Sequence, residues 1–356
     1  MIDPMTGTPT ALAVSPDSGT HWTEPGAWPV ADGVHRIPLP LPMDGLRAVN
    51  VYAVESEAGL TLVDGGWAIR ESRAALESGL ALIGHAPADI TRILVTHVHR
   101  DHYTLAVVLR REFGAHVTLG LADKATIDVL HQRSAGGGIS QSVRVLEESG
   151  AHHLAKAWAE FSASSTPDLS QWDYPDSWLD GDQTVAVGSR ALDAVHTPGH
   201  TRGHFVFADR AAGLMFAGDH VLPTITPSIG FEAALADQPL GDFLGSLAKV
   251  RALPDLRLLP AHGPVAPSTH IRVDQLTAHH DVRLGLCREA VGSDALTAFA
   301  VARELPWTRH EMHLDDLDLF NVALAVLETR AHLELLVARG EVTVSPSPEG
   351  MLYRCA

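Results

Sequence analysis

The feature that most constrains this chain is a short cluster of histidine and aspartate residues with the sequence THVHRDH. The cluster starts at the end of the apolar, β-branched run Ile93–Thr96, which predicts a strand, and helical periodicity follows it. Residues two apart on extended backbone face the same side, so His97 and His99 are expected to point together. Asp101 and His102 come in the following turn and can face a second centre. Because imidazole and carboxylate groups suit Zn²⁺ and similar cations, the cluster predicts a metal site.

Three further motifs place a histidine or an aspartate where a predicted strand ends. They are HTPGHTRGH, which contains His200, AGDH, which contains Asp219, and PAHG, which contains His262. Each motif alone is weak, because a single histidine after a strand is commonly an ordinary surface residue. The recurrence of such motifs at four strand ends predicts that they meet in one centre.

Composition restricts both the ligands and the partners. The 356 residues include 26 Lys and Arg against 43 Asp and Glu, and the net charge of −17 disfavours a sequence-independent nucleic-acid binder. The two cysteines, Cys287 and Cys355, cannot build a disulfide scaffold or a thiolate zinc site. No apolar run approaches the ~18 residues of a membrane span. A secretion signal, with a basic start and an apolar stretch, is not recognisable, so we expect a cytoplasmic protein.

The order of predicted elements suggests how the chain is divided. Residues 1–30 contain five prolines and no lysine or arginine, and are expected to form a partly mobile leader. Residues 31–268 hold two rounds of strands alternating with helices, which indicates an α/β architecture for a catalytic domain. Residues 121–179, between the two rounds, are expected to be a helical insert that acts as a lid or as a cap with its own core.

The C-terminal part, residues 269–356, is expected to be a mostly helical domain. Ser293 is a predicted N-cap for a helix over Asp294–Leu305, and two short strands near the end predict a hairpin. Helices followed by a hairpin resemble a winged helix. This part has eight arginines, no lysine and thirteen acidic residues, so a DNA-reading role is not expected.

In their order along the chain, the four motifs resemble those of the metallo-β-lactamase superfamily, from about Val34 to Pro267. The resemblance includes the strand-turn LVDGG ahead of the metal motif. It implies the α+β four-layer αββα sandwich, with two sheets face to face, helices outside and metals at one edge. It also implies two divalent metal ions, with zinc as the expected metal and iron or manganese as alternatives. The implied ligands are His97, His99 and His200 for the first ion, Asp101, His102 and His262 for the second, and Asp219 as a bridge, with Asp64 orienting ligands from behind.

Departures from the family pattern reduce the number of family branches that this chain is expected to resemble. Asp219 stands where the main subclass of zinc β-lactamases has a cysteine, which argues against antibiotic hydrolysis and resembles the glyoxalase II-like and lactonase-like branches. With only three lysines in the chain, a glutathione clamp like that of glyoxalase II is not expected. A hydrolase core followed by a winged-helix-like part also resembles the lactamase-like endoribonuclease branch, although the acidic charge disfavours a long polyanion.

These observations predict a dinuclear metal-dependent hydrolase that uses a metal-bridging hydroxide on a small ester, thioester or lactone. Asp101 is the expected catalytic residue, because it can ligate a metal and hold the nucleophile in line. The alternative is a phosphodiesterase or ribonuclease of the same fold. The expected partner is a small molecule, with no nucleic acid and no membrane, and the sequence allows a homodimer.

Overall fold

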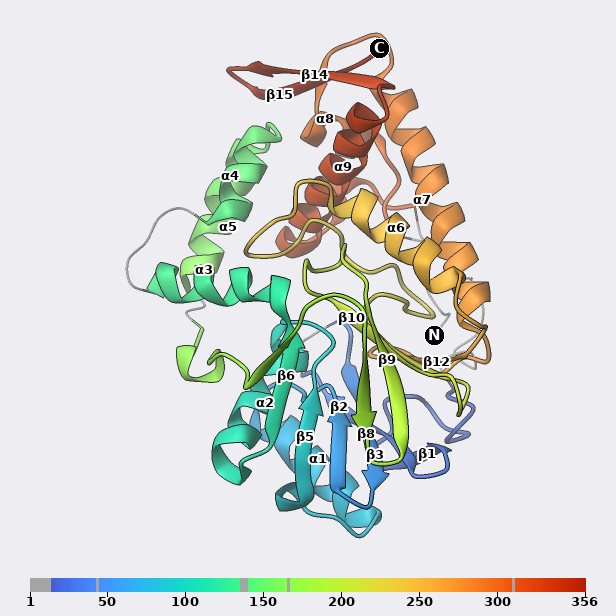
Figure 1. The fold of residues 1–356 in the computed structure, drawn as a ribbon. Helices are drawn as coiled ribbons and strands as arrows, with labels where there is room; N and C mark the ends of the chain where they lie inside the picture. Colours follow the sequence, from blue (N-terminus) through green and yellow to red (C-terminus); the bar gives the residue numbers. More distant parts are fainter. Residues whose placement is uncertain (1–13, 43–44, 135–139, 165–166, 309–310) are drawn as a thin grey trace.

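Two β-sheets lie face to face at the centre of the molecule (Figure 1). The computed structural model describes residues 14–42, 45–134, 140–164, 167–308 and 311–356. The seven strands of the first sheet are paired in chain order: β1 (Trp28–Ala31), β2 (Val34–Pro40), β3 (Ala48–Ser56), β4 (Gly59–Val63), β5 (Ile90–Leu94), β6 (His116–Gly120) and β7 (Ser177–Leu179). The five strands of the second sheet are paired in the order β12-β11-β10-β9-β8: β8 (Gln183–Val187), β9 (Arg190–His196), β10 (Phe205–Asp209), β11 (Leu214–Gly218) and β12 (Arg257–Pro260).

The direction of the strands determines which loops meet. Strands β4 to β7 are parallel to one another, so the loops that follow β4, β5 and β6 leave the first sheet at one edge. Strand β12 is parallel to β11, so the loops after these two strands also leave the second sheet at one edge. Side chains just beyond parallel strands are therefore brought together.

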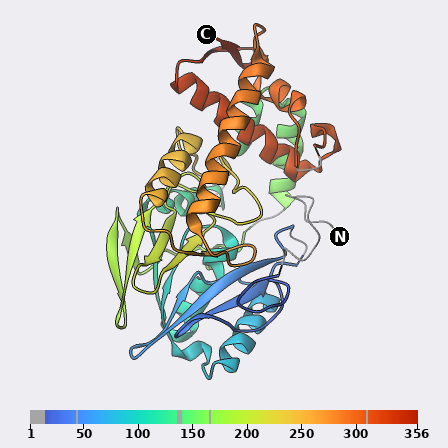
Figure 2. The same cartoon turned by 90° about the vertical axis from the view of Figure 1, so that its right-hand side faces the viewer.

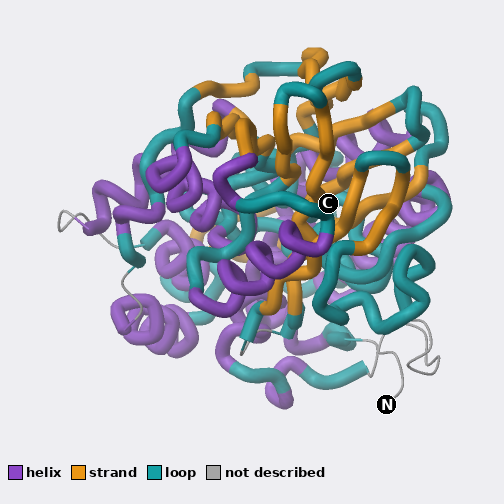
Figure 3. Tube along the Cα trace, turned by 90° about the horizontal axis from the view of Figure 1, so that it is seen from below, coloured by secondary structure: helices purple, strands orange, loops and turns teal. Residues whose placement is uncertain are grey.

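Helices cover the outer face of each sheet and complete four layers. Helices α1 (Arg70–Leu82) and α2 (Arg100–Phe113) share an apolar core with the first sheet. Helices α6 (Pro239–Arg251) and α7 (Thr269–Val291) share another with the second sheet. A third core, rich in phenylalanine, fills the space between the two sheets. Seen from below, the strands run from the upper edge of the view to its middle, with helices to their left and below them (Figure 3). The predicted αββα sandwich is confirmed.

The C-terminal region is largely helical and rises above the sheets (Figure 2). After α7 it contains β13 (Leu296–Thr297), α8 (Ala298–Glu304), the short 3₁₀ helix η5 (Leu314–Asp316), α9 (Leu319–Ala338), β14 (Val342–Ser347) and β15 (Gly350–Cys355). Its three strands form a small sheet in the order β13-β15-β14. The helical character agrees with the sequence analysis, whereas the assignment as a winged helix stays a prediction.

The helix predicted over Asp294–Leu305 begins later than expected, and this prediction is wrong at its N-terminal end. Leu296 and Thr297 pair with β15 instead, so helical geometry begins only at Ala298. Thr297 rather than Ser293 is the N-cap, because its hydroxyl accepts a hydrogen bond from the Ala300 amide at 3.2 Å.

The insert packs on the C-terminal helices. It contains η3 (Leu121–Asp123), α3 (Lys124–Ser134), α4 (Gln141–Glu148), α5 (His152–Ser164) and η4 (Leu169–Gln171). Buried side chains of α4 and α5 belong to the same apolar core as those of α7, α8 and α9. Arg330 of α9 forms an ion pair with Glu148 of α4 at 2.9 Å. A role as a lid stays a prediction.

The N-terminal segment also packs against the body from Val14 onward. Ser15 is fully buried, and its hydroxyl accepts a hydrogen bond from the Val265 amide at 3.1 Å. Residues 1–13 of the expected leader lie outside the described residues. The remaining short helix, η2 (Pro87–Asp89), precedes β5. No helix in the described part of the chain is long and apolar enough to cross a membrane.

Candidate metal centre

The predicted site residues all follow strands at one edge of the sandwich. Asp64 comes directly after β4, and its φ of 64° turns the chain sharply there. His97 lies between β5 and α2, and His99 is the N-cap residue of α2, which places Asp101 and His102 in its first turn. The remaining members of the set come after strands of the second sheet: His200 after β9, Asp219 after β11 and His262 after β12.

Three imidazoles converge in a first group. His97 Nε2 lies 3.0 Å from His99 Nδ1. His200 Nε2 lies 3.0 Å from the same His99 nitrogen. His97 and His200 are buried, and His99 is half-buried, so the group has one side open to solvent. Three nitrogens at this spacing can face one cation and leave a coordination position open.

A second group of donors lies beside the first. Asp101 Oδ2 is 3.3 Å from His262 Nε2 and 3.7 Å from His102 Nε2. Asp219 lies between the two groups, because its Oδ1 is 3.4 Å from His262 Nε2 while its Oδ2 is 3.5 Å from His200 Nε2. The structure thus brings together all seven residues that the sequence analysis proposed as metal ligands.

The donor atoms of the second group are unsatisfied, which tests whether an ion fits there. His102 Nε2, His262 Nε2 and Asp219 Oδ1 are buried and have no hydrogen-bond partner. A buried polar atom without a partner is costly. Divalent cations bound among these atoms would satisfy them, so the residues present fit the two ions that the sequence predicted.

Four of the candidate ligands, all histidines, are held from behind by a protein acceptor or donor. The supporting contacts are His97 Nδ1 to Thr96 Oγ1 at 3.1 Å, His102 Nδ1 to Asp64 Oδ2 at 2.9 Å, His200 Nδ1 to the Ser228 carbonyl at 2.9 Å, and His262 Nδ1 to the Ala48 carbonyl at 2.7 Å. Such contacts fix the tautomer and the ring orientation of a metal-binding histidine. They leave the opposite ring nitrogen of each histidine free to bind an ion.

The local electrostatics differ between the two groups. Burial and neighbouring histidines lower the pKa of His97 and bring the pKa of His99 to about 3, so both rings are neutral at physiological pH. Burial also opposes a charge on His102, but the carboxylates of Asp64, Asp101 and Asp219 outweigh it and raise its pKa to about 9. A cation that binds to the second group must therefore displace a proton from His102.

Asp123 supports the first group, a role that the sequence analysis missed. It lies at the end of η3, which follows β6, and its Oδ2 accepts a hydrogen bond from the Val98 amide at 2.9 Å. Its Oδ1 accepts another from the Gly203 amide at 2.8 Å. Asp123 therefore ties the His97 loop to the His200 loop. Its position after a third parallel strand is a signal that could have identified it.

Asn50 supports the His262 loop from β3, and no motif pointed to it. Its side-chain amide donates to the Pro260 carbonyl at 3.0 Å and to the Gly263 carbonyl at 2.9 Å. Arg36 donates in turn to Asn50 Oδ1 at 3.0 Å and forms a buried ion pair with Asp17 at 2.8 Å. The loop is thereby connected to the N-terminal segment.

His204 is a third supporting residue, and the sequence analysis assigned it no role. Its Nε2 accepts a hydrogen bond from the Asp219 amide at 3.2 Å, and its Nδ1 lies 2.9 Å from Thr197 Oγ1. Gly218 permits this contact, because a Cβ there would lie 2.6 Å from His204 Nε2. The ring therefore positions Asp219 and does not face the open side of the centre.

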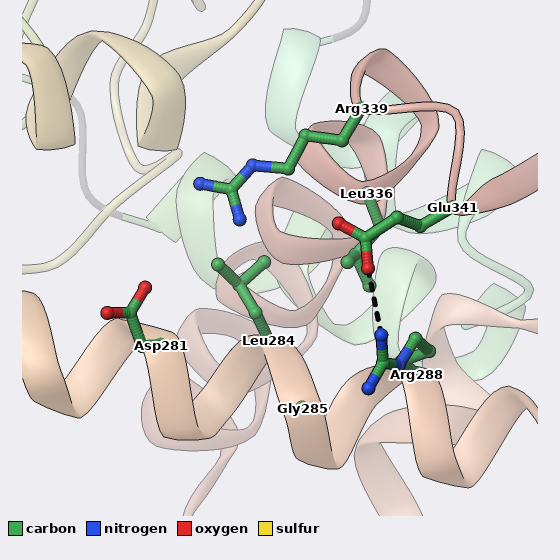
Figure 4. Close-up of a pocket in the computed structure, with 7 residues that line it drawn as sticks. All are labelled: Asp281, Leu284, Gly285, Arg288, Leu336, Arg339 and Glu341. Atoms are coloured by element: carbon green, nitrogen blue, oxygen red, sulfur yellow. Dashed lines mark hydrogen bonds and ion pairs between the residues drawn. The ribbon is translucent and has the colours of Figure 1, made fainter.

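A hollow elsewhere in the C-terminal region differs in chemistry from the metal centre. It has a volume of about 150 Å³, and Arg288 forms an ion pair with Glu341 at 3.1 Å at one side of it (Figure 4). Its lining, from α7 and the end of α9, contains no histidine: Asp281, Leu284, Gly285, Arg288, Leu336, Arg339 and Glu341. The strand-end centre is therefore the better candidate for catalysis.

Comparisons with known proteins show which family this chain resembles. The family model of the metallo-beta-lactamase superfamily matches residues 44–262. A probable metallo-hydrolase of Bacillus subtilis is 26% identical over 330 residues, which are 86% of this chain and 92% of that protein. The crystal structure of a beta-lactamase domain protein from Burkholderia ambifaria matches with a TM-score of 0.76 at 26% identity, over 96% of this chain and 97% of that one. A hydroxyacylglutathione hydrolase of Rhizobium johnstonii is 27% identical over 166 residues, 47% of this chain and 45% of that protein.

Proposed function

The chain belongs to the metallo-beta-lactamase superfamily and is a hydrolase of that superfamily, and we propose that it uses two divalent metal ions to hydrolyse a small ester, thioester or lactone. The proposed ligands are the seven residues of the strand-end centre, with zinc as the favoured metal. The proposed partner is a small molecule in the cytoplasm.

The position of Asp219 carries the proposal. One of its oxygens faces His200, in the first group, and the other faces His102 and His262, in the second. A carboxylate in this position can bridge two cations, whereas a single-ion centre would need only one of its oxygens. The unpartnered nitrogens of His102 and His262 support a second ion in the same way.

Two bound divalent ions would supply Lewis acidity and lower the pKa of a water molecule between them. The protein's own contribution is to hold the donors and to orient that water. Asp101 is suited to the second task because its carboxylate is 14% exposed, more than that of Asp219 at 9%. Burial opposes ionisation of Asp101, but His102 and His262 outweigh it and lower its pKa, so it is an anion and a hydrogen-bond acceptor at neutral pH.

The substrate class rests on chemistry and on one partial relative. The partial relative is named a hydroxyacylglutathione hydrolase, and because an acylglutathione is a thioester, this name supports a thioester within the proposed class. The net charge of −17 makes a long polyanion a poor substrate. The charge of a small anionic substrate is a lesser obstacle, because the two ions would make the centre locally positive.

A substrate panel on the metal-loaded protein tests the proposal. Thioesters, aryl esters, lactones, β-lactams and a phosphodiester are compared at equal concentration, with metal content measured on the same preparation. We expect turnover of a carbonyl substrate and its loss, by at least ~100-fold, in Asp101→Asn and Asp219→Asn, since each removes an anionic donor. Asp281→Asn, an exposed change on α7, is the matched control. Turnover of the phosphodiester alone would replace this proposal by the phosphodiesterase alternative.

A further inference from the structure

A second cluster of histidines lies where helices α7 and α9 pack side by side in the C-terminal region (Figure 1). His280 of α7 and His332 of α9 are buried, and their rings approach with His280 Nδ1 3.1 Å from His332 Nε2. His279 and Glu328, on the same two helices, are half-buried beside them. None of these four residues belongs to the strand-end centre.

The hydrogen bonds of the cluster fix its tautomers. His332 Nδ1 donates to the carbonyl of Glu328 at 2.8 Å, which makes Nδ1 the protonated nitrogen of the neutral ring. His332 Nε2 must then accept, and His280 Nδ1 must donate to it. This leaves His280 Nε2 as a bare lone pair. That nitrogen is buried and has no partner.

Two further candidate donors lie close to His280. Ligand atoms of His279, His280 and Glu328 all lie within 4.8 Å of one another. Within the described part of the chain, Glu328 forms no ion pair. The nearby guanidinium of Arg283 is held by the Pro306 carbonyl at 2.9 Å and stacks on Trp307 at 4.4 Å. The cluster therefore combines two neutral imidazoles, one carboxylate and an unsatisfied buried lone pair.

We propose that His279, His280 and Glu328 form a binding site for one additional divalent cation of zinc type. Two histidines and one glutamate are an established donor set for zinc, with a fourth position left for water. The contact from His280 Nδ1 to His332 is the kind of support that orients a metal-binding imidazole. An ion in this position would link α7 to α9 and stabilise the C-terminal region.

The proposed site is separate from the strand-end centre. Phe243 of α6 lies between the two regions, with its ring 5.4 Å from that of His280 and 5.0 Å from that of His220. His220 follows Asp219 in the chain, so an aromatic layer divides the two sets of donors. Removing a donor of the α7–α9 site is therefore expected to leave catalysis unchanged.

Zinc stoichiometry of the full-length protein tests the proposal. The wild type, Glu328→Gln and His279→Asn are loaded with excess zinc, desalted and measured by native mass spectrometry together with elemental analysis. We expect the wild type to hold one zinc ion more per chain than either variant, while all three have equal kcat/KM. The use of two variants, both at half-buried positions, keeps the comparison valid if one of them folds poorly.

Two control variants, and a variant that lacks two ligands of the strand-end centre, test whether the additional ion binds between α7 and α9. Glu289→Gln and His153→Asn change the same residue types at exposed positions, and should keep the wild-type stoichiometry. In a His97→Ala, His262→Ala background, the ion that depends on Glu328 should still bind. Equal zinc content in the wild type and in Glu328→Gln would overturn the proposal. Loss of the same ion in either control variant would also overturn it.

Discussion

At the scale of single residues, the candidate centre depends on groups that lie behind the candidate ligands. Asp64 is the clearest case, because one carboxylate serves two roles. Its Oδ2 holds His102 Nδ1 at 2.9 Å, and its Oδ1 accepts a hydrogen bond from the Thr96 amide at 2.8 Å. The same side chain thus orients a ligand of the second group and ties the loop that leads to His97.

Replacing Asp64 by asparagine is expected to weaken metal binding at the second group by roughly 10–100-fold. The asparagine amide has only one oxygen. If its NH₂ group faces His102, the imidazole loses the acceptor that orients it; if the NH₂ group faces Thr96, the Thr96 amide loses its acceptor. Competition with a chromophoric zinc chelator measures the affinity. Asp281→Asn serves as the control for removing one negative charge. Unchanged affinity in Asp64→Asn would show that His102 is oriented by other contacts.

Glu232 gives a pH-dependent prediction. Burial and the neighbouring Asp123 raise its pKa to about 8, against 4.5 in the unfolded chain. A raised pKa means that the folded protein holds the proton more tightly than the unfolded chain does. The contribution of Glu232 to the free energy of unfolding is therefore fully present below about pH 4.5, and it is lost as the pH rises through about 8.

Glu232→Gln should remove this dependence, because the amide stays neutral and can still accept from the Arg202 amide, which lies 3.2 Å from Glu232 Oε2. Urea unfolding at a series of pH values is the measurement. We expect the variant to match the wild type near pH 5 and to be more stable near pH 8. Glu289→Gln, which is exposed, should follow the wild type throughout. Parallel curves for the wild type and Glu232→Gln would contradict the prediction.

The sequence predicted the candidate ligands because each motif is local. A strand, a turn and a histidine occupy a few consecutive residues, so their arrangement is encoded within a short window. Asn50 and Asp123 were missed because the contacts that they make are long-range. Asn50 and Pro260 are separated by 210 positions in the chain, and Asp123 and Gly203 by 80. Only the fold brings such pairs together.

At the scale of elements, the segment before β1 is part of the scaffold of the centre. Asp17 and Arg36 form an ion pair in which both side chains are fully buried. Arg36 also donates to Asn50 Oδ1, and Asn50 holds the backbone on both sides of His262. The described part of the expected leader is thus connected to the second group through β2 and β3.

Asp17→Ala is expected to destabilise the protein by about 3–5 kcal/mol, because it leaves the buried guanidinium of Arg36 without its counterion. The free energy of unfolding from urea titration measures the effect. Asp32→Ala removes an exposed aspartate from the turn before β2, and should change stability by less than about 0.5 kcal/mol. An equally small effect in Asp17→Ala would show that the segment before β1 contributes little.

The strands were easier to predict than the ends of helices. The four motifs follow strands β5, β9, β11 and β12, as the sequence analysis expected, and β11 is apolar along its whole length because every one of its residues is buried. The helix α8 was misplaced at its start, since pairing with β15 determines where Leu296 and Thr297 lie. Capping residues alone could not distinguish Ser293 from Thr297.

At the scale of the whole molecule, the catalytic part and the C-terminal part share one core. Buried residues of β10 and β11, of α4 and α5, and of α7 and α9 form a single apolar cluster. Arg272 of α7 donates to the Leu222 carbonyl at 2.5 Å and to the Ile225 carbonyl at 2.8 Å. That loop continues to Ser228, whose carbonyl holds His200. The C-terminal region therefore reaches the first group of candidate ligands.

A chain that ends at residue 268 is therefore expected not to fold as an independent hydrolase. Without α7 and α9, the apolar faces of α4, α5 and α6 would be exposed. The loop that Arg272 holds would also be released. Exposed patches of this kind lead to aggregation. Size-exclusion chromatography and thermal unfolding, with the full-length chain as reference, measure the outcome. A soluble fragment that unfolds cooperatively and binds zinc as tightly as the full chain would show that the two parts are independent.

A point variant separates the loss of the apolar core from the release of the loop that Arg272 holds. Arg272→Met keeps the helix and its apolar stem but removes the donors to the loop, so it should fold and bind the first zinc ion less tightly.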